Sequence, residues 1–229
     1  MKNAIKLKLL SVALIIPFFS ACGGGGSGGT TESTDPSQSF NLTKLKDAST
    51  EGTVFQSSLN GTYDGPSGKK NATGNITVKN IGQETVDGVL TYKSRTELSI
   101  IVDGNYVGST GITYIDENGY FVKFTVDDNV TCTPTSQTLL PDTISVGDSG
   151  NTESISCSDG KTQKGTWAAE SSSPGYIIFT RDDNVYEGAQ LVSSTKQSYK
   201  INSDGYIVGM DMDISNIRDG VTINLSSSK

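Results

Sequence analysis

The chain has 229 residues, with 18 Lys and Arg against 25 Asp and Glu, three Cys and no His. The lack of His excludes a Ser-His-Asp triad, a Cys-His dyad and any metal or haem ligated by imidazole. A net charge of −7 argues against nucleic-acid binding, which needs clustered Lys and Arg. An apolar content of 34% with 26 Gly favours strands and turns over long helices.

The N-terminus has the organisation of a secretory signal peptide. Lys2, Lys6 and Lys8 form a basic region, and residues 9–19 form an apolar stretch of about eleven residues. This stretch is too short for a transmembrane helix, which needs roughly twenty apolar residues. We therefore expect residues 1–21 to be an export signal that is removed from the mature protein.

The end of this signal carries a specific motif, Phe19-Ser20-Ala21-Cys22. It resembles the lipobox of bacterial lipoproteins, Leu-(Ala/Ser)-(Gly/Ala)-Cys, at three of its four positions. The resemblance implies cleavage before Cys22, diacylglycerol on its sulfur, and a further acyl chain such as palmitate on its amino group. Gly23, where an Asp would imply retention in the inner membrane, implies the outer membrane and leaves the periplasmic and surface faces open. The alternative is an ordinary signal peptide without lipid.

A flexible tether follows the lipobox. Residues 22–39 begin with the lipidated Cys and continue with Gly, Ser and Thr, and they offer no apolar side chain to bury. Organised sequence starts at Phe40, and it resembles no known family. We expect one β domain over residues 40–229, with two smaller β domains divided near 132–150 as the alternative.

The pattern of the domain is that of an all-β fold with little helix. Asn118-Gly119, Asp159-Gly160 and Asp204-Gly205 are strong signals for tight hairpin turns, because these pairs tolerate positive φ. We expect about ten to thirteen short antiparallel strands in a meander-rich sandwich or partly open barrel. The strand-like runs are 54–63, 75–81, 86–94, 96–104 and 221–226, and the expected hairpins are 112–128, 152–170, 175–192 and 198–214.

The two remaining cysteines predict a disulfide. Cys132 and Cys157 lie at the ends of strand-like runs in a chain with an export signal, where paired cysteines form bridges far more often than they bind metal. We expect a structural Cys132–Cys157 bridge that closes the intervening loop.

Acidic residues are the main candidates for chemistry. The pairs Asp127/Asp128, Asp182/Asp183 and Asp211/Asp213 lie near Asn, which favours solvated hairpin turns over a pair of catalytic carboxylates. Asp116, Asn118, Asp211 and Asp213 are weak calcium candidates, because none of their segments completes a calcium loop. We expect no metal, no cofactor and no catalytic residue. Residues 147–150 (Gly-Asp-Ser-Gly) resemble the nucleophile motif of trypsin-like proteases, but without His we interpret them as a turn.

Three hypotheses for function remain. The first is a non-enzymatic, lipid-anchored envelope protein that binds a protein, a glycan or an apolar ligand, or has a structural role. The second is a carboxylate-dependent glycan hydrolase, which needs two acids about 5–10 Å apart in a cleft. The third is a carrier of apolar ligands or lipoproteins with a cavity inside a β-barrel. The membrane, through Cys22, is the one partner that the sequence indicates.

Overall fold

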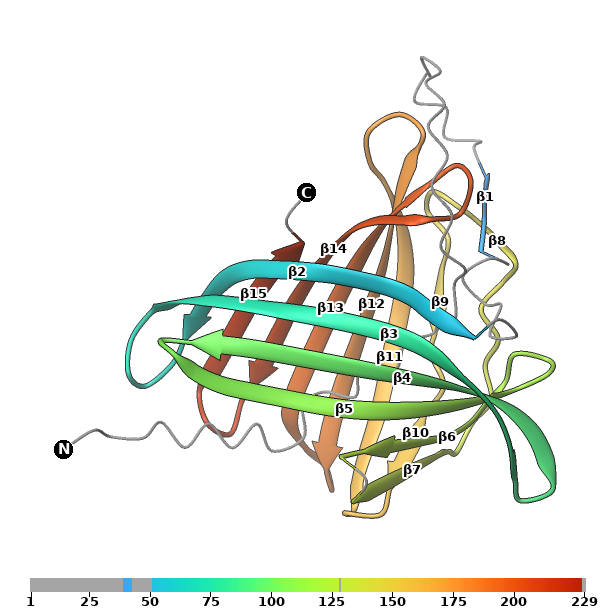
Figure 1. Cartoon of the computed structure of the whole chain (residues 1–229), viewed down its shortest axis with the longest axis horizontal. Helices are drawn as coiled ribbons and strands as arrows, with labels where there is room; N and C mark the ends of the chain where they lie inside the picture. The colour runs from blue at the N-terminus through green and yellow to red at the C-terminus, as the bar shows by residue number, and fades with distance from the viewer. Residues whose placement is uncertain (1–38, 43–50, 128, 228–229) are drawn as a thin grey trace.

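The computed structural model describes residues 39–42, 51–127 and 129–227 (Figure 1). Their regular secondary structure is entirely β, without helix. The strands are β1 (Ser39–Asn41), β2 (Gly52–Asp64), β3 (Lys70–Val86), β4 (Val89–Val102), β5 (Asn105–Asp116), β6 (Phe121–Val126), β7 (Val130–Pro134), β8 (Thr143–Ser145), β9 (Ser149–Asn151), β10 (Ile155–Cys157), β11 (Lys161–Ser171), β12 (Tyr176–Glu187), β13 (Gln190–Asn202), β14 (Ile207–Asn216) and β15 (Val221–Ser227). The expected signal peptide, lipidated Cys22 and most of the tether lie outside the described residues.

Twelve of these strands form a closed antiparallel barrel. Neighbours run in the order β10-β7-β6-β5-β4-β3-β2-β15-β14-β13-β12-β11, and β10 also pairs with β11, which closes the ring. The seam is short, since β10 has three paired positions with β7 and two with β11. β7 and β9, at the two ends of residues 132–150, therefore belong to one sheet.

Two smaller features lie at the edge of the barrel. β9 pairs with β11, further along β11 than the positions at which β11 pairs with β10. β1 pairs with β8 in a separate two-stranded sheet (Figure 1). Phe40 of β1 and Ile144 of β8 are opposite each other and almost fully buried. They join the main hydrophobic cluster, so this small sheet covers part of the barrel core.

The core follows from alternation along the strands. On β12, the odd-numbered residues from Ile177 to Val185 are all buried, whereas residues 178, 182 and 184 are half-buried. The cluster continues through inward residues of β2, β3, β4, β11, β13, β14 and β15. Trp167 of β11 is buried and stacks on Phe179 with ring centroids 5.8 Å apart. Large apolar side chains thus pack one part of the barrel interior.

The structure confirms the all-β antiparallel class and has the barrel rather than the sandwich. The Asn-Gly and Asp-Gly pairs form the β5–β6, β10–β11 and β13–β14 turns, with φ of 85°, 82° and 83° at Gly119, Gly160 and Gly205. The expectation of short strands is wrong for β2–β5 and for β11–β14, which have ten to seventeen residues. Bulges in β2, β3, β13 and β14 let strands continue past irregular positions.

Two of the three acidic pairs that were expected in turns lie within strands. Asp211 and Asp213 are exposed positions of β14. Asp182 and Asp183 lie inside β12, paired with Lys196 and Thr195 of β13, and not in a solvated turn. The turn comes later, at Gly188, where φ is 62°. The run of Asp and Asn residues predicted a turn, but Asp183 lies on the inward face of β12. Its charge is neutralised there by Arg181 on the same face.

Candidate functional site

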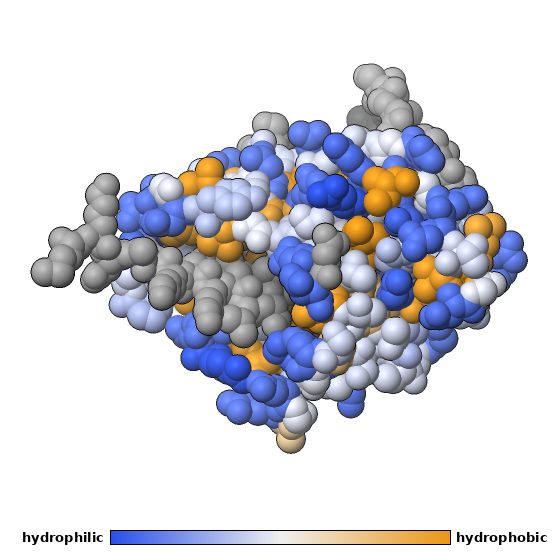
Figure 2. All heavy atoms as spheres, turned by 60° about the horizontal axis from the view of Figure 1, so that its bottom comes forward, coloured by the Kyte–Doolittle hydropathy of each residue, from blue (hydrophilic) through white to orange (hydrophobic). Residues whose placement is uncertain are grey.

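A pocket of about 160 Å³ opens at the end of the barrel where the β6–β7 and β10–β11 turns meet. It lies beside the seam, because both turns connect strands that close the ring. Its lining consists of Val126, Asp127, Asn129, Val130, Cys157, Asp159, Lys161, Thr162, Gln163 and Val185. Figure 2 shows one face of the molecule, on which hydrophobic residues form separate patches among hydrophilic ones.

The walls of the pocket are mainly apolar. Val126 and Val130 are paired across the β6–β7 turn, and Val185 faces inward from β12. Val126, Val130 and Cys157 also pack against the buried Phe121, Phe124, Cys132 and Ile155, which form a second, smaller cluster. These walls can exclude water from an apolar group of a ligand without a conformational change of the barrel.

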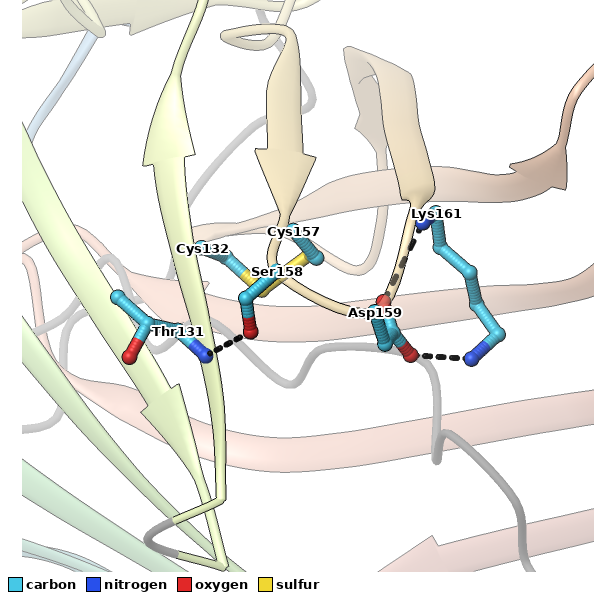
Figure 3. Close-up of a disulfide and its surroundings, with 6 residues drawn as sticks. All are labelled: Thr131, Cys132, Cys157, Ser158, Asp159 and Lys161. Atoms are coloured by element: carbon cyan, nitrogen blue, oxygen red, sulfur yellow. Dashed lines mark hydrogen bonds and ion pairs between the residues drawn. A yellow bond between two sulfur atoms is a disulfide. The ribbon is translucent and has the colours of Figure 1, made fainter.

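A disulfide holds the two sides of the pocket together (Figure 3). Cys132 of β7 and Cys157 of β10 are bonded, as the sequence predicted, and their Cα atoms are 3.9 Å apart at paired positions of the sheet. Beside the bridge, the backbone N–H of Thr131 donates to Ser158 Oγ at 3.1 Å, and the Ser158 N–H donates to the Thr131 carbonyl at 2.7 Å. The bridge therefore reinforces the seam next to the pocket.

The rim of the pocket carries compensated charges. Lys161 Nζ forms an ion pair with Asp159, whose other oxygen accepts the Lys161 backbone N–H at 3.2 Å (Figure 3). Asp127, with φ of 47°, accepts the backbone N–H of Thr110 on Oδ1 at 2.8 Å, and Asn129 Nδ2 donates to the Asp127 carbonyl at 2.7 Å. The Lys and Asp side chains of the rim are thus engaged in holding the two turns.

Gln163 is the polar residue of the pocket that lies deepest. It lies on β11 between Ile155 of β10 and Val185 of β12, and its exposed fraction is 1%. Neither Nε2 nor Oε1 of its amide has a hydrogen-bond partner among the described residues. An unpaired buried amide costs roughly 1–3 kcal/mol, so this position is unfavourable unless something else pairs with it.

An ionic cluster lies further inside the barrel. Arg181 Nη2 donates to Glu153 Oε1 at 3.3 Å and to Asp183 Oδ1 at 3.1 Å, and Arg181 Nε donates to Asp183 Oδ2. Each of these side chains is about 1–3% exposed. A cavity of about 10 Å³, lined in part by Arg181, Glu153 and Phe179, adjoins them and is about the size of one water molecule.

Burial sets the electrostatics of this cluster. Loss of solvation raises the pKa of Glu153 above its usual value, and the Arg181 charge offsets this only in part. Burial by itself lowers the pKa of Arg181, but Asp183 and Glu153 outweigh it and the net direction is upward. Burial also raises the pKa of Tyr199, whose hydroxyl donates to Gln197 Oε1 at 2.8 Å.

The sequence-predicted calcium candidates are not brought together. Asp116 Oδ1 accepts the backbone N–H groups of Asn118 and Tyr120 in the β5–β6 turn. Asp211 and Asp213 are exposed on β14, in another part of the sheet. Among the residues that the structure describes, no three acidic, Cys or His side chains form a group that could hold a metal.

Residues 147 and 148 lie in the β8–β9 turn, as expected, whereas residues 149 and 150 already belong to β9. Asp148 Oδ2 accepts the backbone N–H of Ser145 at 2.7 Å, and Gly147 has a φ of 96°. A Cβ at Gly150 would lie 2.7 Å from Trp167 Nε1, so this glycine allows β9 to approach the indole.

Sequence reasoning placed Asp127 in a turn, where it lines the pocket, but it missed Gln163, Glu153 and Arg181. The signal for Arg181 and Asp183 was present, because they share the odd-numbered face of β12 with Ile177, Phe179 and Val185. The burial of Gln163 and Glu153 depends on the closure of the sheet and on the loop before β10, which the local pattern does not determine.

Comparisons with known proteins leave the family of this chain open. No protein-family model matches it, and no curated protein matches it. A solved structure, the beta-barrel-like protein of domain of unknown function DUF1849 from Brucella abortus, aligns with 76% of this chain and 95% of its own. The identity is 9% and the TM-score is 0.40. The described residues contain no helix long and apolar enough to span a membrane.

Proposed function

We propose that this protein is a lipid-anchored protein of the bacterial cell envelope whose barrel binds a small ligand without chemically changing it. The observation that carries the binding role is the pocket at the β6–β7 and β10–β11 end, with valine walls and a disulfide beside it. Pockets with mainly apolar walls and few polar groups are the usual form of small-molecule sites.

The arrangement of the acids favours binding over glycan hydrolysis. A carboxylate-dependent hydrolase needs one acid free to donate a proton and a second free to attack or to activate water. Glu153 and Asp183 instead share Arg181 inside the barrel, and Asp159 of the pocket is paired with Lys161. These acids have structural partners in place of a substrate.

The packing of the barrel favours a small ligand over a long lipid chain. Inward side chains of β2–β4 and β11–β15 pack into one cluster with Phe40 and Ile144 of the small sheet. The pocket of about 160 Å³ is close to the 150 Å³ of an engineered cavity that binds benzene. A ligand, or the part of it that is buried, should therefore be about the size of one ring.

The anchor belongs to the same proposal and is supported by the sequence. Diacylglycerol on Cys22 and a further acyl chain would attach the mature chain to the outer membrane, since two or more chains give lasting attachment. The tether of residues 22–39 would hold the barrel away from the surface, and an envelope protein or glycan could present the ligand.

Ligand binding can be tested by nuclear magnetic resonance with the mature chain carrying Cys22→Ala, titrated with benzene. We expect amide shifts to concentrate at the β6–β7 turn, the β10–β11 turn and Val185. Val130→Phe should fill the pocket and abolish the shifts, whereas Val208→Phe, on an exposed position of β14, should leave them. Shifts spread evenly over the barrel, or unchanged by Val130→Phe, would contradict the proposed site.

The anchor needs a separate experiment. Cells that express the wild-type chain and Cys22→Ala are labelled with radioactive palmitate, and the immunoprecipitated proteins are compared. We expect label on the wild type alone, together with its recovery in the outer-membrane fraction. Equal labelling of both chains would overturn the anchor and leave the ligand-binding proposal untouched.

A further inference from the structure

We propose that Gln163 selects the ligand, and that the pocket takes an uncharged single-ring group with a hydrogen-bond donor and acceptor side by side, as in a cyclic amide. This inference rests on the proposed ligand-binding function and names the chemical class that the same pocket prefers.

The first step is the state of the Gln163 amide. It lines the pocket, is 99% buried, and neither of its two polar atoms has a hydrogen-bond partner among the described residues. Its neighbours across the strands, Ile155 and Val185, offer no polar side-chain atoms. Both polar atoms have almost no accessible surface, so a ligand meets them only when the Gln163 side chain turns toward the pocket, where it offers one donor group and one acceptor framed by apolar side chains.

The second step is complementarity. A group with an adjacent N–H and C=O can form two parallel hydrogen bonds with a carboxamide, with each partner donating one and accepting one. A site whose buried polar groups are paired by the right ligand and left unpaired by a wrong one discriminates far more strongly than an apolar wall. A hydrocarbon of the same shape would leave both Gln163 atoms unsatisfied.

The third step is charge. Lys161, the one cation among the described residues that line the pocket, already has Asp159 as its ion-pair partner, and Asp127 accepts a backbone N–H from Thr110. An anionic ligand would face two carboxylates and one compensated ammonium group. A neutral ligand avoids this electrostatic repulsion, and the valine walls favour a ring over an extended polar molecule.

The fourth step separates Gln163 from other buried polar residues. Thr195, on β13, is 2% exposed and its Oγ1 is also without a hydrogen-bond partner in the described part of the chain. It pairs with Asp183 and not with a residue of the pocket, and it does not line the pocket. Thr195→Val is therefore a matched control in which a buried polar atom is removed away from the site.

The test uses the full mature chain with Cys22→Ala and two ring probes of nearly equal size. δ-Valerolactam has an N–H next to its carbonyl, whereas cyclohexanone has the carbonyl alone. We expect the wild-type barrel to bind the lactam about 5- to 10-fold more tightly, the value of one net hydrogen bond to a buried partner. The side-chain NH₂ signals of Gln163 should shift with the lactam.

Variants locate the preference. Gln163→Met keeps the length of the side chain and removes the amide, so the preference for the lactam should disappear. Thr195→Val should keep it. Gln163→Met should also unfold at higher urea concentration than the wild type, because it removes an unpaired buried amide; a purely structural role for Gln163 predicts the opposite shift.

The outcomes separate the two proposals. If benzene and cyclohexanone bind in the pocket but the lactam binds no better, or if Gln163→Met retains the preference, Gln163 does not select the ligand and the binding function stands. If neither ring probe nor benzene binds, the proposed function fails together with this inference. Gln163 NH₂ signals that do not shift with saturating lactam would also overturn the selection of the ligand by Gln163.

Discussion

At the scale of single residues, the barrel interior contains charged side chains at positions where apolar side chains would avoid the loss of solvation. Arg181 lies between two carboxylates, Glu153 and Asp183, and all three are almost fully buried. Buried charges are tolerated only when they are paired, since each loses its solvation and regains it only through close contacts. The stability of β12 and of the loop before β10 therefore depends on one guanidinium group.

Replacing Arg181 by Met should destabilise the protein by about 3–5 kcal/mol, because two buried carboxylates would lose their counter-charge. Urea unfolding at neutral pH measures this loss. Arg218→Met is the control: its ion pair with Glu187 is half exposed, and such pairs contribute about 0–1 kcal/mol. Equal losses in the two variants would show that Arg181 does not stabilise the fold through burial of its charges.

Glu153 makes stability depend on pH. Burial raises its pKa in the folded chain above the ordinary value of 4.5, so the folded state binds a proton more readily than the unfolded state. The stability from this group is present below pH 4.5 and is lost as pH rises toward the raised folded pKa. Glu153→Gln should remove that loss, so that its advantage over the wild type grows from pH 4.5 upward. Urea midpoints measured from pH 4 to 8 check this, and a constant difference would refute the raised pKa.

At the scale of elements, the seam is the part of the barrel with the fewest paired positions. β10 meets β7 at three positions and β11 at two, whereas β3 and β4 pair along fourteen. The Cys132–Cys157 bridge lies at one of the three β7–β10 positions. It compensates for the short pairing by closing a loop of 25 residues in sequence separation.

Cys132→Ser with Cys157→Ser should lower the free energy of unfolding by roughly 3–4 kcal/mol, the chain-entropy value for a loop of this length. The effect should be local before it is global. Hydrogen exchange at β7 and β10 should accelerate more than exchange at β3 and β4, and ring probes should bind more weakly because Cys157 lines the pocket. Uniform acceleration over all strands would show that the bridge does not specifically hold the seam.

The elements also show what sequence reasoning could reach. Hairpins with Asn-Gly or Asp-Gly turns were predictable, because those pairs determine φ locally, as at Gly119 and Gly160. The acidic run at Asp182 and Asp183 was misread because its partner Arg181 lies two residues away on the same face, a relation that turn composition does not reveal. Gln163 was missed because its neighbours β10 and β12 follow from local hairpins, whereas the burial of its face depends on the closure of the sheet into a barrel.

At the scale of the whole molecule, closure was beyond sequence reasoning for the same physical reason. Successive hairpins predict neighbours in a meander, but whether the first and last strands meet depends on tilt and register summed over the ring. Here β2 and β15, the first and last strands of the barrel, pair at six positions, and β10, a strand of three residues, completes the ring between β7 and β11. The candidate pocket exists only because of this closure, so the sequence could predict its disulfide but not its walls.

At the scale of the whole molecule, the net charge of the mature chain predicts how the protein attaches to a membrane. Removal of residues 1–21 takes three of the 18 basic side chains and no acid, so the mature chain would carry 15 basic against 25 acidic groups, a net charge of −10. Such a chain is repelled by anionic lipid, and its attachment would depend on acyl chains alone. We expect acylated protein to sediment with phosphatidylglycerol vesicles equally at 20 mM and 500 mM salt, and Cys22→Ala protein to stay in solution at both. Salt screens electrostatic attraction within about 10 Å at 0.1 M. If the Cys22→Ala chain bound vesicles at low salt and lost this binding at high salt, the chain would have a basic membrane-binding surface. That result would contradict an anchor made of lipid alone.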